Sequence, residues 1–300
     1  MSIIVNNISK WYKKVKALDA IFFEVKPGEL FGLIGPDGAG KTTLFRILTT
    51  LLVADKGEAT VAGYDVINDY KSIRNHVGYM PGRFSLYQDL TIEENLNFFA
   101  TIFGTTVEEN YDLIKDIYIQ IEPFKNRRVG KLSGGMKQKL ALCCALIHKP
   151  KVLFLDEPTT GVDPVSRKEF WEMLKRLQKK DITILVSTPY MDEAALCDRI
   201  ALITDGQILQ LSTPEEIISS FPKKIFKVKA DETYQLIKDL KEFPKTHSAY
   251  PFGEYMHFTS NIPDFKTDNL IQFLKDKKHT NIEVFETAPT IEDSFMELSK

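Results

Sequence analysis

The stretch Gly35–Thr43 reads Gly-Pro-Asp-Gly-Ala-Gly-Lys-Thr-Thr; an apolar run, Leu30–Ile34, precedes it and helix-forming residues, Leu44–Leu48, follow it. A strand, a glycine-rich loop and a helix in this order form the context of a phosphate-binding P-loop. Glycines let backbone N–H groups converge on phosphate oxygens, and the helix start adds positive charge. A plain glycine-rich turn is the alternative, but strand, loop and helix would then coincide by chance. The pattern predicts an α/β fold of the P-loop NTPase kind.

Two side chains of this loop have specific expected roles. Lys41 should reach the β- and γ-phosphates of a nucleotide, and the Thr42 hydroxyl should bind Mg²⁺ shared with that nucleotide. The expected cofactors are therefore ATP and Mg²⁺. The expected contacts of this loop with the nucleotide are Gly35, Pro36, Asp37, Gly38, Ala39, Gly40, Lys41, Thr42 and Thr43.

Two adjacent acids, Asp156 and Glu157, follow the apolar run Val152–Leu155. Carboxyl ends of parallel strands share one edge of a sheet, so these acids should lie near the P-loop. Successive strand residues face opposite ways, which predicts that Asp156 assists Mg²⁺ while Glu157 polarises the attacking water. The alternative is that acids at a strand end merely begin a turn.

A second anion-binding element is predicted at Leu132–Gln138. Ser133 is an N-cap candidate, and Gly134 and Gly135 expose backbone donors at the start of an apolar helical stretch. Gln138 completes the set of expected nucleotide contacts here. One nucleotide would hardly need two such elements from the same chain. An ordinary capped helix is the alternative.

The remaining pattern predicts a domain over residues 1–221 with a mixed sheet core, interrupted by a helical subdomain at about 84–147. Predicted helices there are Glu93–Phe99 and Tyr111–Ile121, and Asp205-Gly206-Gln207 predicts a hairpin turn. Residues 222–300 predict a small α+β appendage. The predicted strands of the main domain are Ile3–Val5, Ile21–Val25, Leu30–Ile34, Ala59–Val61, Val77–Met80, Val152–Leu155, Ile182–Val186 and Ile200–Ile203. Those of the appendage are Lys224–Lys229 and Asn281–Phe285, with helices Tyr234–Phe243 and Asp268–Lys277.

Composition limits which binding partners and which cellular compartment are expected. The chain has 300 residues, 43% of them hydrophobic, and a formal charge of -2, so no basic field favours nucleic acid or anionic lipid. Apolar runs are strand-length, well below the roughly 20 residues of a spanning helix. No secretory signal is visible at the start, so a cytoplasmic location is expected. The 3 cysteines match neither a disulfide framework nor a metal site, and we expect buried reduced thiols.

Together these motifs, in this order, resemble the ATP-binding cassette (ABC) family over about Ile3 to Phe221. The resemblance implies that Tyr12 stacks on adenine and that Thr160–Asp163 communicates across a dimer. It also implies that two cassettes sandwich ATP head to tail, each nucleotide lying between one P-loop and the partner's Leu132–Gln138 equivalent. ATP binding and hydrolysis would then drive membrane domains, and the chain would be an ATPase.

Further stretches, such as Phe84–Tyr87 and Pro289–Phe295, resemble exporter subunits of the ABC-2 type, the multidrug and daunorubicin-resistance class. This resemblance implies an ABC-2 type membrane-spanning permease as partner and a peripheral position on the inner face of the cell membrane. Residues Phe84–Asp89 would meet the permease's coupling helices. Internal packing is an equally good interpretation of their aromatic and apolar side chains.

Two positions depart from the family pattern. Gly82 stands where the family usually has a glutamine that reaches Mg²⁺ and water, and Pro189 stands where a histidine usually contacts the γ-phosphate. Neither offers a polar side chain. We hypothesise that this chain's own site hydrolyses slowly and that the chain pairs with a different cassette; a homodimer remains the alternative. Competing functions are a regulatory nucleotide sensor and a soluble translation-factor-like ABC ATPase.

Overall fold

The computed structural model of the protein describes residues 2–299 and divides into two compact units. The first unit ends at Glu215, and the second runs from Glu216 to Leu298. The division falls within a short helix, α8 (Pro214–Ser219). Each unit has its own hydrophobic core. The sequence-based boundary after residue 221 remains a proposal about where the main domain ends.

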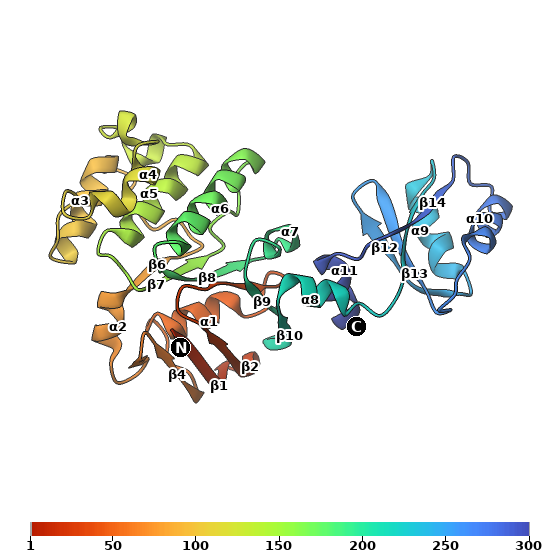
Figure 1. Ribbon diagram of the computed structural model, residues 1–300, viewed down its shortest axis with the longest axis horizontal. Coiled ribbons are helices and arrows are strands. Elements are labelled where there is room, and N and C mark those ends of the chain that lie inside the picture. Colours follow the sequence, from red (N-terminus) through yellow and green to blue (C-terminus); the bar gives the residue numbers. More distant parts are fainter. Residues whose placement is uncertain (1, 300) are drawn as a thin grey trace. The chain divides into compact units, whose positions relative to one another are not determined.

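A six-stranded sheet forms the centre of the first unit (Figure 1). In spatial order its strands are β10 (Gln207–Ser212), β9 (Arg199–Thr204), β3 (Leu30–Ile34), β8 (Thr183–Thr188), β7 (Val152–Asp156) and β6 (Val77–Met80). Neighbouring strands are parallel except for β10, which pairs antiparallel with β9. Every residue of β3, β7 and β8 is buried, as expected for parallel strands covered on both faces. The predicted mixed sheet is confirmed.

A second, antiparallel sheet is joined to the first by a helix. Its strands, in spatial order, are β2 (Val15–Val25), β1 (Ile3–Tyr12), β4 (Lys56–Val61) and β5 (Tyr64–Asp65). Helix α1 (Lys41–Leu48) contacts strands of both sheets and lies between them in Figure 1. Its buried Phe45 ring meets the ring of Phe154 in β7 edge to face at 5.9 Å. This packing holds the start of α1 beside the carboxyl end of β3.

The predicted helical segment is present between β6 and β7. It contains α3 (Ile92–Ile102), α4 (Tyr111–Tyr118), α5 (Gly134–Leu146) and the single 3₁₀ turns Glu122–Phe124 and Val129–Lys131. Thr91 and Glu94 form a reciprocal capping box that begins α3. Both predicted helices are confirmed, although α4 ends before Ile121. The other helices of the unit are α2 (Tyr70–His76), α6 (Pro164–Gln178) and α7 (Met191–Ala194).

The predicted hairpin turn is also confirmed. Asp205 and Gly206 connect β9 to β10 with φ values of 47° and 74°. Two successive left-handed residues suit the right-handed twist of the paired strands, and Asp-Gly adopts them readily.

The second unit is a four-stranded sheet with three helices. Its strands, in spatial order, are β12 (Thr246–Phe252), β13 (Tyr255–Ser260), β11 (Ile225–Lys229) and β14 (Glu283–Thr287), and its helices after α8 are α9 (Thr233–Glu242), α10 (Thr267–Asp276) and α11 (Ile291–Leu298). The α+β composition agrees with the prediction. The β12–β13 hairpin and α11 were not predicted. Pro251 lies inside β12, and a proline in a sequence argues against a strand because it cannot donate a hydrogen bond to a neighbouring strand. The folded sheet accommodates Pro251 because β12 is an edge strand.

A buried carboxylate anchors α11 to this sheet. The side chain of Asp293 is fully buried. It accepts hydrogen bonds from the Tyr250 hydroxyl at 2.5 Å, from His257 Nδ1 at 2.6 Å and from the Thr290 backbone N–H at 2.6 Å. Burial alone would raise the pKa of this carboxyl, but the hydrogen bonds, led by that from His257, outweigh it and lower the pKa.

Replacing Asp293 with alanine should therefore destabilise the second unit by about 3 kcal/mol, because buried donors lose their acceptor. Since the folded pKa lies below the unfolded value of about 3.9, the carboxylate contributes stability at neutral pH and loses it as pH falls through the folded pKa. Denaturant unfolding of the full chain at pH 7 and below about pH 4 should show the difference between variant and wild type shrinking in acid. Exposed Asp264→Asn is the control. A difference that does not change with pH would contradict this account.

Candidate nucleotide-binding site

The P-loop lies between β3 and α1, as the sequence predicts. Pro36, Asp37 and Gly38 are exposed, whereas the Gly35 N–H donates to the Thr188 carbonyl of β8 at 3.3 Å. Gly40 is the N-cap of α1, with a φ of 101° and no side-chain cap. The first N–H groups of α1 thus have no intrahelical partner and are available to an anion.

The close packing of this loop explains two of its glycines. A Cβ on Gly35 would lie 2.0 Å from the Ile203 carbonyl oxygen, and one on Gly40 would lie 2.5 Å from the Ala17 carbonyl oxygen. Gly40 also needs a left-handed backbone. The glycines let the loop pack tightly against β2 and β9.

Lys41 folds back into the loop. Its side chain is 3% exposed, and Nζ donates to the carbonyl oxygens of Gly35 at 2.8 Å and Pro36 at 3.0 Å. Nζ also lies 3.1 Å from Glu157 Oε1. The structure therefore brings together the two charged groups that the sequence assigned to phosphate binding and to water activation.

The acid pair lies at the carboxyl end of β7. Asp156 is 1% exposed and accepts a hydrogen bond from the Ser187 hydroxyl of β8 at 2.7 Å. Glu157 leaves the strand with a left-handed φ of 52°, and its N–H donates to the Ser187 carbonyl at 3.0 Å. Because β7 ends at Asp156, strand alternation does not by itself set the direction of Glu157, which has a left-handed backbone and whose carboxylate contacts Lys41. The division of roles between the two acids stays a prediction.

The donor set suits Mg²⁺ held jointly with a nucleotide. No group of three or more His, Cys, Asp or Glu residues within residues 2–299 could hold a metal ion alone. Thr42, in the first turn of α1, and Asp156 offer the hydroxyl and carboxylate oxygens that Mg²⁺ prefers, and phosphate oxygens and water would supply its other ligands. Their assignment as metal ligands remains a prediction.

The second predicted anion site is separate from the first. Ser133 is the N-cap of α5, as predicted, and its Oγ accepts from the Met136 N–H at 3.4 Å. A Cβ on Gly135 would lie 2.8 Å from Ser166 Oγ, so this helix start is packed against α6. In the part of the chain that the structure describes, no hydrogen bond or ion pair joins residues 133–138 to residues 35–43.

Tyr12 is the last residue of β1 and lies within the first hairpin. It pairs with Val15 at the turn between β1 and β2, and it is 44% exposed. The same hairpin reaches the P-loop, because Ala17 borders Gly40. An adenine-stacking role for Tyr12 remains a prediction.

Both departures from the family pattern border the acid pair and the P-loop. A Cβ on Gly82 would lie 3.1 Å from the Asp156 carbonyl oxygen and 3.8 Å from Asp156 Oδ2. Pro189 directly follows Thr188, whose carbonyl binds the P-loop. Sequence reasoning missed Ser187, although a polar residue at the end of a strand beside β7 was a usable signal.

An apolar cavity of about 470 Å³ lies between the sheet and the helical segment. Its lining includes Tyr79, Phe84, Leu86, Phe99 and Gln138. Leu86 is buried, which agrees with internal packing, whereas Tyr87 is 49% exposed and its ring meets Phe98 at 4.8 Å. Internal packing therefore accounts for Leu86, and contact of the exposed side chains of Phe84–Asp89 with a permease stays a prediction.

Solved structures with related folds support this description. An ATP-binding subunit of an ABC transporter aligns with a TM-score of 0.67 and 27% identity over 74% of this chain and 93% of that one. The cassette MJ0796, solved as a dimer with ADP and Pi after hydrolysis, aligns with a TM-score of 0.64 and 25% identity over 70% and 98%. These matches confirm the predicted P-loop fold.

Sequence relatives match this chain with higher identity than these structures do. The probable multidrug ABC transporter ATP-binding protein YbhF of Escherichia coli is 38% identical over 278 residues, covering 91% of this chain but only 47% of YbhF. Our chain thus spans about half the length of that relative. The doxorubicin resistance ATP-binding protein DrrA of Mycobacterium tuberculosis is 39% identical, covering 72% of this chain and 67% of DrrA.

A third relative, the Nod factor export ATP-binding protein I of Burkholderia thailandensis, is 39% identical, with 71% of each chain covered. The family model described as ABC transporter matches residues 18–160, which contain the P-loop, the Ser133 helix start and the acid pair. With the P-loop lysine and the acid pair in contact on this fold, the comparisons confirm the resemblance: the chain belongs to the ATP-binding cassette family of ABC transporter proteins.

Proposed function

We propose that this chain binds and hydrolyses ATP as a subunit of an ABC exporter. The observation that carries the proposal is the 3.1 Å contact between Lys41 Nζ and Glu157 Oε1, which puts a phosphate-binding cation and a candidate general base at one sheet edge. The drug-resistance and export names of the relatives favour an exporter. The alternatives are a regulatory or slowly hydrolysing subunit and a soluble ABC ATPase without a transport role.

Different residues of the site would carry phosphate binding, Mg²⁺ binding and proton transfer. Free backbone N–H groups of the P-loop and of the first turn of α1 would bind the phosphates, with Lys41 exchanging Glu157 for the β- and γ-phosphate oxygens. Thr42 and Asp156 would hold Mg²⁺, which neutralises charge that develops on the phosphates. Glu157, released from Lys41, would accept a proton from the attacking water. Ser187 keeps Asp156 oriented through its hydrogen bond.

A second cassette would complete the site. The helix start Ser133–Gln138 is solvent-accessible in part, and within residues 2–299 no hydrogen bond or ion pair joins it to this chain's own P-loop, which favours its use on a partner's nucleotide. The similar cassette MJ0796 was solved as a dimer, which supports the pairing of two cassettes. We favour a different cassette as partner over a second copy, because Gly82 and Pro189 make this chain's own site incomplete.

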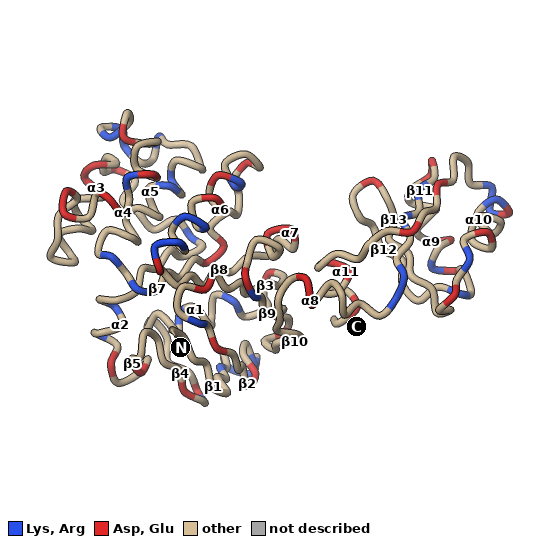
Figure 2. The backbone as a smooth tube through the Cα atoms, viewed as in Figure 1, with Lys and Arg blue, Asp and Glu red and all other residues tan. Residues whose placement is uncertain are grey.

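A membrane permease of the ABC-2 type is the second proposed partner. No helix among residues 2–299 is long and apolar enough to cross a bilayer. The cavity beside Phe84 and the exposed ring of Tyr87 offer an apolar place for a permease helix. Lys/Arg and Asp/Glu residues are interspersed along the chain (Figure 2), so we propose no nucleic-acid partner. The chain would then lie in the cytoplasm, peripheral on the inner face of the cell membrane.

Restoring the two family residues, Gly82→Gln with Pro189→His, should raise turnover of this chain's site. Polar groups near developing phosphoryl charge contribute on the order of 10²–10³ in rate, although coupled groups do not simply add. The new Gln Cβ must displace its neighbour by a few tenths of an ångström, because it would start 3.1 Å from the Asp156 carbonyl. Single-turnover hydrolysis in the purified, partnered complex is the measurement, with Gly82→Ala as control. No gain in the double variant would count against a degenerate site.

Purification tests the function as a whole. We expect the full chain, extracted from membranes in detergent, to copurify with a polytopic protein and to hydrolyse ATP only with Mg²⁺. Association with ribosomes instead would favour the soluble ABC ATPase. Tight ATP binding with no turnover in the partnered complex would favour the sensor.

A further inference from the structure

Glu193 is a buried carboxylate that the proposed chemistry does not use. It lies on the short helix α7, four positions after Pro189, and is 2% exposed. Its Oε2 accepts from the Thr188 hydroxyl at 2.5 Å, and its Oε1 accepts from the Thr159 hydroxyl at 2.8 Å and from Arg167 Nε at 3.1 Å. A buried carboxylate is stable only when its oxygens are satisfied in this way.

The donors come from two segments that flank the proposed site. Thr159 follows Glu157 by two positions, and Arg167 lies on the helix α6 that begins soon after. Thr188 ends β8 and directly precedes Pro189. Glu193 therefore joins the loop after the acid pair to the loop that carries Pro189.

A second set of contacts reinforces this junction. The Arg167 guanidinium lies 4.1 Å from the centroid of the Tyr190 ring, and the Tyr190 N–H donates to Thr188 Oγ1 at 3.1 Å. The backbone at Glu157 is held from both sides, since its N–H donates to Ser187 and its carbonyl accepts from the Thr160 N–H at 3.2 Å. Both sides adjoin the residues that Glu193 binds.

We infer that Glu193 is a positioning residue: by joining Thr159 to Thr188 it fixes the left-handed turn at Glu157 and thus the direction of the Glu157 carboxylate. This inference rests on the proposed ATPase function. In the usual family arrangement a histidine side chain stands at position 189; here proline leaves the loop without one, and the buried Glu193 junction holds the loop in place. Among the described residues, no hydrogen bond or ion pair joins Glu193 to the P-loop or to the acid pair.

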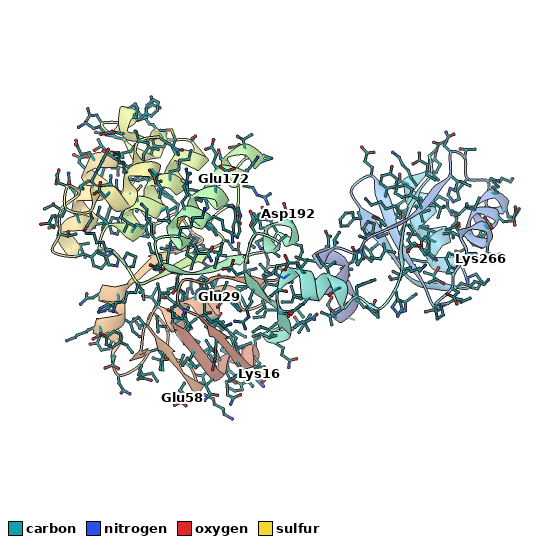
Figure 3. All side chains as sticks on the ribbon, in the orientation of Figure 1. Lys16, Glu29, Glu58, Glu172, Asp192 and Lys266 are labelled. Carbon is teal, nitrogen blue, oxygen red and sulfur yellow. The ribbon has the colours of Figure 1, made fainter. Side chains whose placement is uncertain are left out.

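Glu193→Gln tests the inference in the full chain with its copurifying partners. Both threonine hydroxyls and Arg167 lose their charged acceptor, and one carboxylate oxygen becomes an amide NH₂ that cannot accept. We therefore expect kcat for Mg-ATP hydrolysis to fall about 10-fold or more, with KM and ATP affinity within about 2-fold of wild type. Asp192→Asn is the matched control. Asp192 also pairs with Arg167, at 3.3 Å, but its side chain is 76% exposed and lies on α7 at the surface of the first unit (Figure 3).

Thr159→Val is a milder second variant, because it removes one hydroxyl while keeping the side-chain volume. It should also lower kcat. Combined with Glu193→Gln it should reduce kcat little further, since both substitutions disrupt the hydrogen bonds of the same carboxylate. Slower turnover at unchanged ATP affinity in both variants, with Asp192→Asn near wild type, supports the inference.

Several results would overturn it. Unchanged kcat in both variants would do so, as would an equal loss in Asp192→Asn. A lowered thermal midpoint with normal kcat at low temperature would show that Glu193 only stabilises the fold. These outcomes differ from failure of the proposed function, in which the wild type itself shows no Mg-dependent turnover and Glu157→Gln changes nothing.

Discussion

Lys41→Ala is expected to weaken ATP binding at this chain's site on the order of 100-fold or more. The ammonium lies inside the P-loop and would make charge-assisted hydrogen bonds to two phosphate groups, which contribute about 1.5–3 kcal/mol each. Titration with a fluorescent ATP analogue measures the affinity directly. Lys115→Ala, an exposed lysine on α4, is the control for general loss of positive charge.

The variant also removes the partner of Glu157, so its fold must be checked by thermal unfolding. A folded Lys41→Ala protein that keeps wild-type affinity would refute the assignment of Lys41. The consequence would extend to Glu157, because the contact between these two side chains is what places the acid at the phosphates.

Glu157→Gln should leave ATP binding within a few-fold of wild type but reduce turnover by about 10²–10⁴-fold, the usual range for loss of a general base. Glutamine keeps the length and can still occupy the left-handed turn, but it cannot take a proton from water. Single-turnover hydrolysis with enzyme in excess over ATP separates chemistry from binding. Glu172→Gln, on the exposed face of α6 and labelled in Figure 3, is the control.

If Glu157→Gln turned over at the wild-type rate, another group would have to activate the water. A parallel loss of ATP affinity would point instead to a structural role for the Lys41–Glu157 pair. The two outcomes call for different revisions, so both quantities need to be measured on the same preparation.

The first unit could be predicted well because its signals are local. An apolar strand, a glycine-rich loop and a helix are contiguous in sequence, and so are β7 and its acids. The Asp205–Gly206 turn likewise depends on two adjacent residues. Such features need no knowledge of which strands become neighbours.

What could not be predicted depends on contacts between distant segments. Ser187 matters because β8 pairs with β7 in a register that sets it opposite Asp156. Glu193, Thr159 and Arg167 converge only after α6 and α7 pack together. The direction of Glu157 follows from a left-handed φ that no propensity for glutamate suggests.

The second unit shows the same limit in its fold. Pro251 interrupts an otherwise readable strand, and only the edge position of β12 in the folded sheet makes it acceptable. Asp293 looks like an ordinary acid in the first turn of α11, yet it is the buried acceptor for donors from β12 and β13.

Calorimetric titration of the full chain with Mg-ATP, with and without its copurifying partners, tests the central claim most directly. We expect saturable heat of association with wild-type protein and its loss in Lys41→Ala. Absence of any binding heat under both conditions, or identical heat from Lys41→Ala, would contradict a nucleotide site at this loop.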